Sequence, residues 1–461
     1  MDARFSRAQR IVAGLVIAVG LAFRIGVVAV GAAGSPDARQ YHRLGQELVL
    51  RQRLAFGPPP TAPSYVRLPG YPLVAGWLID RGAVDWAEHA RRATRWNVAF
   101  DLGTALLLLW VGRRLFGAWT GIVAAGLVLF CPLGFLLSAY PLTESLATLL
   151  STAVVALVLW LERPWWRAVL VGLCLGFGIL VRFDLISLVP AVALGAWLAG
   201  WTRRQVILSV LCAATIYLPW PIRNQLVFGQ PHFAGAELMT QAGVAIPNGF
   251  TQWMRTWCVA RPGEAQLANL IVFGRAFDHT TPWAQLAQMS DSADEQARLA
   301  AMIDRLGKKG FSDGVDADFA ALASERWAAH PWRTLVTLPM LRLQRLYAPP
   351  VRGELPIKVD WLGLPDRWWI FTAANWFMYV GALVGAVALW LQRRRKALAI
   401  VAVAVLGRTV LHAFAVPHFV GQRYLAEVVP LFLLVAAVGV VGVVRLILRR
   451  RPTRIKAADS T

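Results

Sequence analysis

The sequence predicts an all-α protein that crosses a membrane about ten times and carries interfacial helices and a small external helical region. Three observations predict this class. The chain of 461 residues is 57% apolar and contains 21 tryptophans, which lies well outside the usual composition of soluble domains. Several runs with few or no charges are long enough to span a bilayer. Basic residues gather beside these runs, as membrane topology requires.

Hydropathy places the expected spans in two groups separated by a long polar region. The first run follows a basic start and is about twenty residues long, which exceeds a signal-peptide core, so we expect a retained first helix. The ten expected spans are 11–30, 95–111, 118–137, 145–161, 168–181, 185–201, 206–220, 368–391, 397–415 and 425–444.

The distribution of arginine predicts the topology. An N-terminus on the cytoplasmic side places every basic cluster on that same side, as the positive-inside rule requires. Tryptophans fall at many span ends, where an indole lies at headgroup depth. The basic clusters on the cytoplasmic side are Arg113-Arg114, Arg163 with Arg167, Arg203-Arg204, residues 393–396 and residues 445–456.

The net charge of +21 does not predict nucleic-acid binding, because the arginines stand in pairs and triplets beside apolar runs. Three of the four cysteines, Cys131, Cys174 and Cys212, lie inside apolar segments, and only Cys258 lies in a long loop. This distribution indicates neither a disulfide framework nor a cysteine metal site.

Two large regions then fall on the outer side, residues 31–94 and 221–367. In the first, residues 40–50 are expected to form a short interfacial helix, and the rigid stretch 68–72 precedes an apolar run too short to span the membrane. In the second, Ser292 and Glu295 form a capping-box pattern before a helix that stops near Gly307. Further helices are expected over 316–329 and 332–346.

The second outer region, residues 221–367, does not have the pattern of an independent catalytic domain. Strand alternation, a phosphate-binding glycine loop and metal-ligand spacing are missing from the sequence, and the inward loops are too short for a nucleotide-binding domain. We therefore expect any chemistry on the outer face. The predicted units are 1–220 (a transmembrane module that includes the external loop 31–94), 221–367 (an extracytoplasmic helical region), 368–448 (the C-terminal transmembrane helices) and 449–461 (a basic cytoplasmic tail).

Charged and aromatic side chains converge on the predicted outer face. Guanidinium groups there are unexpected from topology, and they match phosphate oxygens bidentately. They indicate a pocket for an anion, with phosphate preferred. The candidates are Arg24, Arg39, Tyr41, Arg67, Tyr71, Glu144, Arg182, Asp184, Arg223, His418, Arg423 and Tyr424.

Plainer roles are also open for several of these residues. Arg24 can extend its side chain toward the interface, Arg182 and Asp184 can pair with each other, and Arg423-Tyr424 can anchor the last helix. Glu144 can serve the start of its helix, and a histidine such as His418 can be an ordinary hydrogen-bonded side chain.

Asp37 opens the first outer loop, in Ser35-Pro36-Asp37-Ala38-Arg39-Gln40-Tyr41. A lone acid in a loop is usually solvated surface. Its place at the end of a span, beside the arginine-rich outer face, makes it the candidate catalytic carboxylate.

The ordered motifs resemble the GT-C class of integral membrane glycosyltransferases, in the branch of protein O-mannosyltransferases and lipid A aminoarabinose transferases. The resemblance covers about residues 20–230 and only the outline of 231–367. It rests on the order of several weak motifs. These are 36–41, 67–73, 113–117, 141–145, 178–182, 219–224 and Arg423-Tyr424.

The resemblance implies that a sugar passes from a polyprenyl-phosphate donor to an acceptor hydroxyl on the outer face, with inversion at the anomeric carbon. Asp37 would act as the base, and Arg67, Arg182, Arg223 and Arg423, in falling order, would bind the donor phosphate. Many relatives have two adjacent acids in the first loop, whereas this chain has Ala38 after Asp37. We therefore predict no cofactor and no obligatory divalent metal.

The expected partners are a polyprenyl-phosphate-linked sugar, an acceptor that is a lipid, glycan or protein, and membrane lipids, without nucleic acid. The excess of Arg over Lys favours a GC-rich bacterial genome and hence a bacterial inner membrane. Two alternatives stay open. A lipid-linked sugar flippase would usually show an internal repeat, which is missing here. A ligase or polymerase of lipid-linked glycans would use diphosphate lipids.

Overall fold

The computed structural model describes residues 5–30, 34–79, 85–160, 162, 164–234, 248–259, 264, 289–309, 312–349, 369–415 and 421–449. All regular elements within these ranges are helices, and the one β feature there is an isolated bridge between Ala55 and Pro63. The predicted all-α class is confirmed. His418 and the tail after Arg449 lie outside the described residues.

The N-terminal helices occupy most of the first 230 residues. They are α1 (Arg7–Ala29), α2 (Pro36–Arg51), α3 (Gly70–Trp77), α4 (Trp86–Phe116), α5 (Ala118–Leu129), α6 (Pro132–Ser138), α7 (Glu144–Leu159), α8 (Trp165–Val181), the 3-10 helix η1 (Phe183–Leu188), α9 (Val189–Ala199), α10 (Arg203–Tyr217) and α11 (Pro219–Phe228).

The remaining helices form the second region that the sequence predicts to be external and the C-terminal part. They are α12 (Asn248–Arg255), α15 (Ala293–Lys309), α16 (Asp313–Ala329), the π-helical turn η3 (Arg333–Thr337), α17 (Leu338–Tyr347), α18 (Trp369–Leu391), α19 (Arg395–Val410), the π-helical turn η5 (Leu411–Ala415), the 3-10 turn η6 (Gln422–Leu425) and α20 (Val429–Arg449).

Five of the described helices are long and apolar enough to cross a membrane, and a sixth crossing is possible if the bent pair α5–α6 counts as one span. The pair bends by 53°. Pro132 begins α6 after extended backbone at Cys131, so the helix cannot run straight through. Shorter apolar helices cover Glu144–Leu159, Trp165–Val181 and Phe183–Ala199. The protein is therefore an integral membrane protein, and the number of ten crossings stays a prediction.

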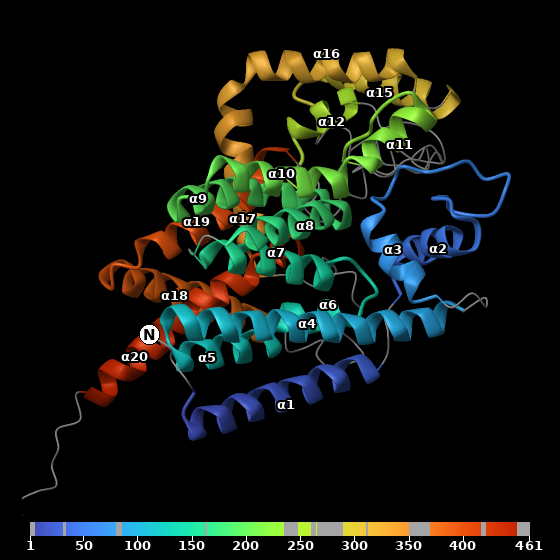
Figure 1. Ribbon diagram of the computed structural model, residues 1–461. Coiled ribbons are helices and arrows are strands. Elements are labelled where there is room, and N and C mark those ends of the chain that lie inside the picture. Colours follow the sequence, from blue (N-terminus) through green and yellow to red (C-terminus); the bar gives the residue numbers. More distant parts are fainter. Residues whose placement is uncertain are drawn as a thin grey trace, which may run out of the picture.

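The long helices lie side by side in a stack that begins with α1 and continues through α4, α7 and α8 to α10 (Figure 1). The N-terminus and the last turn of α20 lie on the left of this view, at one end of the stacked helices, whereas α2 and α3 lie on the right, at their other end. The end that carries α2 and α3 is the end that the sequence predicts to be external.

The first external region differs from its prediction at one point that matters for Asp37. The interfacial helix begins at Pro36 and not near residue 40, because the Ser35 side chain accepts a hydrogen bond from the Ala38 amide and Pro36 fits the first helical position. Asp37 therefore lies in the first turn of α2, where a carboxylate also suits the helix dipole. The prediction that it lies in a loop is wrong.

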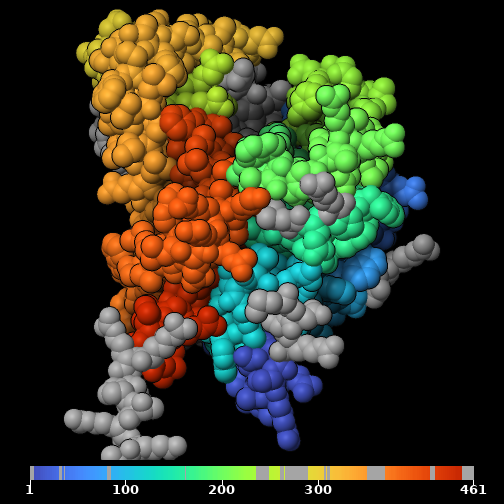
Figure 2. All heavy atoms as spheres, turned by 60° about the vertical axis from the view of Figure 1, so that its left-hand side comes forward, coloured from blue at the N-terminus to red at the C-terminus, as the bar shows by residue number. Residues whose placement is uncertain are grey.

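Helices α12, α15 and α16 pack into a small lobe with its own apolar core, which includes Phe250, Trp253 and Phe319. This lobe covers one end of the molecule, next to the C-terminal helices (Figure 2). Helices α15 and α16 follow the sequence prediction closely, whereas α12 was not predicted: Ser292 caps α15 through the Glu295 amide, and α16 ends at Ala329 before His330. However, α15 continues past Gly307 to Lys309.

Candidate active site

A polar cavity of about 140 Å³ lies where α2, the segment before α3, the α8–η1 junction, η5 and η6 meet. It brings together side chains that are far apart in sequence, and seven of them are candidates from the sequence. The lining residues are Asp37, Tyr41, Val66, Arg67, Leu68, Thr143, Val181, Arg182, Phe183, Asp184, Ala234, His412, Arg423 and Tyr424.

Asp37 lies between two guanidinium groups. Its Oδ1 accepts a hydrogen bond of 2.5 Å from Arg67, and its Oδ2 lies 4.0 Å from a guanidinium nitrogen of Arg423. The Asp37 side chain is 38% exposed, so part of its carboxylate stays open to the cavity. A small ligand can therefore reach this carboxylate without displacing α2.

Arg67 is held by one face of α2, which also carries Asp37. Its Nε donates to Gln40 Oε1 at 3.0 Å, and its guanidinium lies 5.4 Å from the centre of the Tyr41 ring. The side chain is 25% exposed. These contacts fix the orientation of a guanidinium that still presents donors to the cavity, which is the arrangement that favours binding an oxyanion.

Gly70 lets the Arg67 segment approach the end of α8. A Cβ at this position would lie 2.6 Å from the carbonyl carbon of Leu180 and 2.6 Å from the amide nitrogen of Val181. Backbone atoms cannot move aside as side chains do. The close contact therefore requires glycine, and it places Arg67 and Arg182 on the same cavity.

Arg182 follows directly after α8 and contacts three carboxylates. Its guanidinium lies 2.9 Å from Asp184, 2.9 Å from Glu427 and 3.4 Å from Glu144. It also donates to Thr143 Oγ1 at 3.2 Å. Because these acceptors occupy most of its donors, Arg182 serves mainly to organise the wall of the cavity.

Sequence reasoning missed Arg408 and Glu427, which complete this wall. Arg408 is buried in α19 and lies 2.8 Å from Asp184 and 2.6 Å from Glu427. His412, on the next turn, lies 3.8 Å from Asp184 and lines the cavity. A charge inside an apolar span is costly and commonly marks a function, so Arg408 carried a signal that the sequence analysis did not use.

Arg423 and Tyr424 lie on η6, between α19 and α20. Arg423 forms a partly buried ion pair with Glu144, and its side chain is 17% exposed. Burial raises the pKa of the Tyr41 and Tyr424 phenols, which therefore stay neutral hydrogen-bond donors over the ordinary pH range. Neither phenol is suited to act as a base.

The formal charges of the eight charged groups around the cavity sum to zero, and their side chains differ in solvent exposure. Four are carboxylates, and four are guanidinium groups. Arg67 and Arg423 are the most exposed guanidinium groups, while Arg408 and both buried glutamates are 1% exposed. The eight residues are Asp37, Arg67, Glu144, Arg182, Asp184, Arg408, Arg423 and Glu427.

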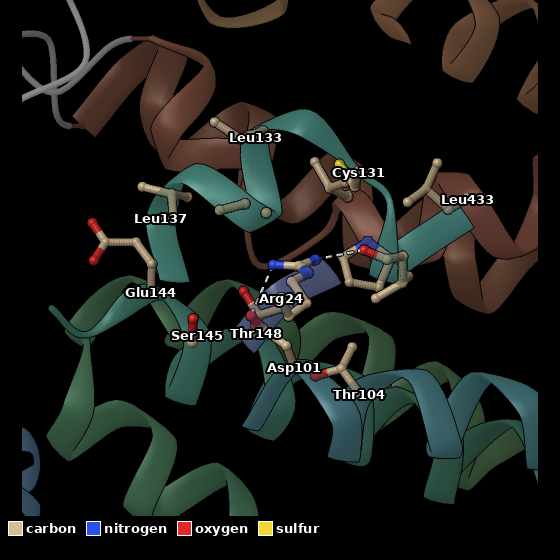
Figure 3. Close-up of a pocket in the computed structure, with 15 residues that line it drawn as sticks. Arg24, Asp101, Thr104, Cys131, Leu133, Leu137, Glu144, Ser145, Thr148 and Leu433 are labelled. Atoms are coloured by element: carbon tan, nitrogen blue, oxygen red, sulfur yellow. Dashed lines mark hydrogen bonds and ion pairs between the residues drawn. The ribbon is translucent and has the colours of Figure 1, made fainter. Parts of the chain in front are cut away.

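Arg24 lies away from this cavity, next to the bend between α5 and α6 (Figure 3). It is buried, forms a 2.9 Å ion pair with Asp101, and donates to the carbonyl oxygens of Val128 and Leu129. Figure 3 shows the Glu144 carboxylate pointing away from Arg24. Asp101 provides the counter-charge of Arg24 inside the helix bundle. The prediction that Arg24 belongs to the anion pocket is therefore wrong.

Four further candidates also lie outside the lining of the cavity, and one of them, Glu144, lies behind its wall in contact with Arg182 and Arg423. Arg39 lies over the Trp86 ring at 5.4 Å, and Tyr71 is buried behind Tyr41 with ring centres 5.0 Å apart. Arg223 donates to the carbonyl oxygen of Ser64 at 3.0 Å. The structure thus separates Arg223 from the other three predicted phosphate residues.

No group of three or more His, Cys, Asp or Glu side chains within the described ranges has the geometry to hold a metal ion. The carboxylates of the cavity face guanidinium groups instead of one another. The absence of a required metal stays a prediction.

Comparison with known proteins adds a family and a fold. Residues 71–221, less than half of the chain, match the family described as dolichyl-phosphate-mannose-protein mannosyltransferase. This range includes Glu144, Arg182 and Asp184 but neither Asp37 nor Arg67. No curated protein matches the chain.

Among solved structures, the archaeal oligosaccharyltransferase AglB from Archaeoglobus fulgidus, in complex with an inhibitory peptide and a dolichol-phosphate, is similar with a TM-score of 0.53 and 12% identity. The match covers 99% of this chain and 53% of AglB, so the chain spans about half the length of that protein. Its apo form gives a TM-score of 0.52 at 13% identity, over 95% of this chain and 51% of that one.

ArnT from Cupriavidus metallidurans, bound to undecaprenyl phosphate, matches with a TM-score of 0.42 and 17% identity, over 92% of this chain and 77% of ArnT. The chain is an integral membrane protein whose fold is similar to that of AglB. The sequence resemblance to GT-C glycosyltransferases is confirmed, with the mannosyltransferase family matching over residues 71–221.

Proposed function

We propose that the protein is a glycosyltransferase that moves a sugar from a polyprenyl-phosphate donor to an acceptor hydroxyl, with inversion at the anomeric carbon. The observation that carries this proposal is the position of Asp37, an accessible carboxylate between Arg67 and Arg423 in a polar cavity. A base and anion-binding groups therefore occupy one small space, as transfer from a phosphate leaving group requires.

The donor phosphate binds to Arg67 and Arg423. Both guanidinium groups are partly exposed to the cavity, and both are held in place by neighbours. Groups that are fixed before the reaction stabilise developing charge without reorganising. Arg182 ranks below them because its donors are already occupied, and Arg223 drops out of the set because it lies away from the cavity.

An apolar groove beside the cavity supports a lipid-linked donor. The groove has a volume of about 660 Å³ and is lined by α8, η1, α9 and α10. Phe183 lines both spaces, and Phe233 of the groove is the neighbour of Ala234 of the cavity. A polyprenyl chain in this groove would place its phosphate beside Arg67 and Arg423. The structure of AglB in complex with a dolichol-phosphate is consistent with a ligand of this class.

Asp37 takes the proton of the acceptor hydroxyl as its oxygen attacks the anomeric carbon from the face opposite the phosphate. The bond between that carbon and the phosphate oxygen breaks, and the polyprenyl phosphate leaves with the electron pair. One carboxylate is sufficient for this displacement, because the leaving group is already an anion that needs no protonation.

The proposed setting is a bacterial inner membrane with both termini in the cytoplasm and the cavity on the outer side. The positive-inside rule supports this orientation. The proposal also includes the division of the chain into a transmembrane module, an external helical region, C-terminal transmembrane helices and a cytoplasmic tail, with boundaries near residues 220, 367 and 448. The acceptor class is a lipid, a glycan or a protein.

The deciding experiment uses the purified full chain in lipid nanodiscs. Mass spectrometry of co-purifying lipid should recover a polyprenyl monophosphate, and a panel of polyprenyl-phosphate sugars should show release of polyprenyl phosphate on transfer. Recovery of only diphosphate-linked glycans would favour the ligase or polymerase alternative. Movement of an intact lipid-linked sugar between leaflets, without cleavage of its phosphate bond, would overturn the proposal in favour of a flippase.

A further inference from the structure

A second cavity is lined by Gln422 of η6, whose neighbours Arg423 and Tyr424 line the candidate active site. It has a volume of about 280 Å³ and is formed by the bend between α5 and α6, the first turns of α18 and the start of α20. Apolar side chains make up most of its wall. The lining residues are Gly126, Leu127, Phe130, Cys131, Pro132, Leu133, Phe371, Ala374, Asn375, Phe377, Met378, Gln422, Val429 and Leu433.

Two of the aromatic side chains in this wall face outward. Phe130 is 42% exposed and Phe377 is 47% exposed, although both belong to apolar helices. The surface around such helices in a membrane is hydrocarbon and not water. Because both exposed rings line the cavity, this part of its wall borders the lipid.

A pair of buried amides forms the polar part of the wall. Gln422 donates a hydrogen bond from its Nε2 to Asn375 Oδ1. The Nδ2 group of Asn375 is buried and has no hydrogen-bond partner, and the Asn375 side chain is 6% exposed. Leaving such a donor unpaired in an apolar environment is costly, so its position next to a cavity indicates an acceptor atom on a bound molecule.

We infer that this cavity binds one acyl chain of a membrane glycerolipid, with the ester carbonyl of the lipid accepting a hydrogen bond from Asn375. An apolar cavity of about 150 Å³ is enough for benzene, so 280 Å³ accommodates a longer stretch of hydrocarbon. The site is separate from the proposed transfer reaction and does not depend on it.

The neutral wall of the cavity favours a glycerolipid over the polyprenyl phosphate of the proposed donor as the bound molecule. No charged side chain is among the described residues that line this cavity, so it offers nothing to pair with a terminal phosphate. An isoprenoid chain carries no carbonyl that could accept from Asn375, whereas an acyl ester carries one at the start of its chain. The unpaired donor and the neutral wall both favour the glycerolipid.

Photo-cross-linking of the full chain in nanodiscs tests this site. The probe is a phosphatidylethanolamine with a diazirine on one acyl chain, and cross-linked peptides are mapped by mass spectrometry. Cross-links should concentrate on residues 126–133 and 371–378. Ala374→Phe should fill the cavity and reduce them several-fold, while Ala373→Phe, on the exposed side of the same helical turn, should leave them unchanged.

A second variant tests the hydrogen bond without filling the space. An ether-linked probe of the same chain length lacks the carbonyl and should cross-link less than the ester-linked probe. Asn375→Leu should abolish that difference, since leucine has a similar size but no donor. Equal cross-linking of Ala374→Phe and the unmodified chain would overturn the proposal, and so would loss of the cross-links on addition of polyprenyl phosphate.

Discussion

Glu144 and Arg423, which are 279 residues apart in the sequence, form a partly buried ion pair beside the candidate active site. Glu144 is the first residue of α7, and Arg423 lies on the short turn η6 before the last helix. The same carboxylate lies 3.4 Å from Arg182. One buried glutamate therefore holds two guanidinium groups that come from the two halves of the chain.

Replacing Glu144 by Gln should destabilise the protein and weaken binding of the donor. The change removes the counter-charge that Arg182 and Arg423 share; because both guanidinium groups are partly exposed, the cost should stay below the about 3–5 kcal/mol of breaking a fully buried pair. Thermal unfolding in detergent and the KM for the donor measure the two effects. Glu88→Gln, which removes exposed ion pairs on α4, should change neither. An unchanged melting temperature for Glu144→Gln would contradict the role given to this residue.

Asp37→Asn should reduce the rate of transfer by about 10²–10⁴-fold, the usual contribution of a general base. The Asp37 side chain is 38% exposed, so the amide should fit without loss of folding, and co-purifying polyprenyl phosphate should be retained. The matched control is Asp313→Asn, which changes a first-turn acid of α16 far from the cavity. Transfer at the normal rate by Asp37→Asn would remove Asp37 from the role of base.

Lysine substitutions should show that Arg67 contributes to binding of the donor phosphate and that Arg223 does not. Arg67→Lys keeps the charge but loses the planar fork of donors, and a hydrogen bond to a charged group contributes about 1.5–3 kcal/mol. The donor KM or the rate should therefore worsen by about tenfold or more. Arg223→Lys should leave both parameters unchanged, because Arg223 contacts Ser64 outside the cavity. Equal effects of the two substitutions would show that phosphate binding extends beyond the cavity.

The stability of the protein should fall on acidification because of His89, near the start of α4. Burial, together with the charges of His42 and Arg92, lowers the pKa of His89 from 6.5 to about 4. Below pH 6.5 the unfolded chain gains a proton on this imidazole before the folded chain does, so unfolding becomes more favourable between about pH 6.5 and 4. Melting temperatures over this range should decrease, and His89→Gln should make the decrease shallower. A variant with the same pH profile as the unmodified chain would contradict this assignment.

Depth in the membrane was predictable from the sequence, because it depends on a one-dimensional pattern of hydropathy and charge. Asp37, Arg182 and Arg423 each lie just beyond an apolar segment, and the structure places all three on one cavity. Rotation about a helix axis was not predictable in this way. Arg24 has a suitable depth, but its side chain turns toward Asp101 on α4.

Pairings between distant helices were also beyond the sequence analysis. Arg408 and Glu427 lie 2.6 Å apart and complete the wall around Arg182, yet neither belongs to a motif that the resemblance supplied. Only the physical cost of an arginine within an apolar helix singles out Arg408 beforehand. The site therefore combines residues that local patterns locate and residues that tertiary packing brings to them.

The last prediction concerns Gly70, which sets the distance between the two sides of the cavity. A Cβ in Gly70→Ala would meet the backbone of Leu180 and Val181 at 2.6 Å, so α3 has to move away from the end of α8. Overpacking of this kind costs about 1–3 kcal/mol. Because Arg67 precedes this contact and Arg182 follows it, transfer should fall more than stability alone explains.

A matched substitution in α1 gives the comparison. Gly14 has no atom within 4 Å of the added Cβ, so Gly14→Ala should fold normally and keep its activity. The measurements are the melting temperature and the rate of sugar transfer at a temperature where both variants are folded. If Gly70→Ala transfers sugar as fast as Gly14→Ala under those conditions, the close approach of α3 and α8 serves packing only and does not set the geometry of the site.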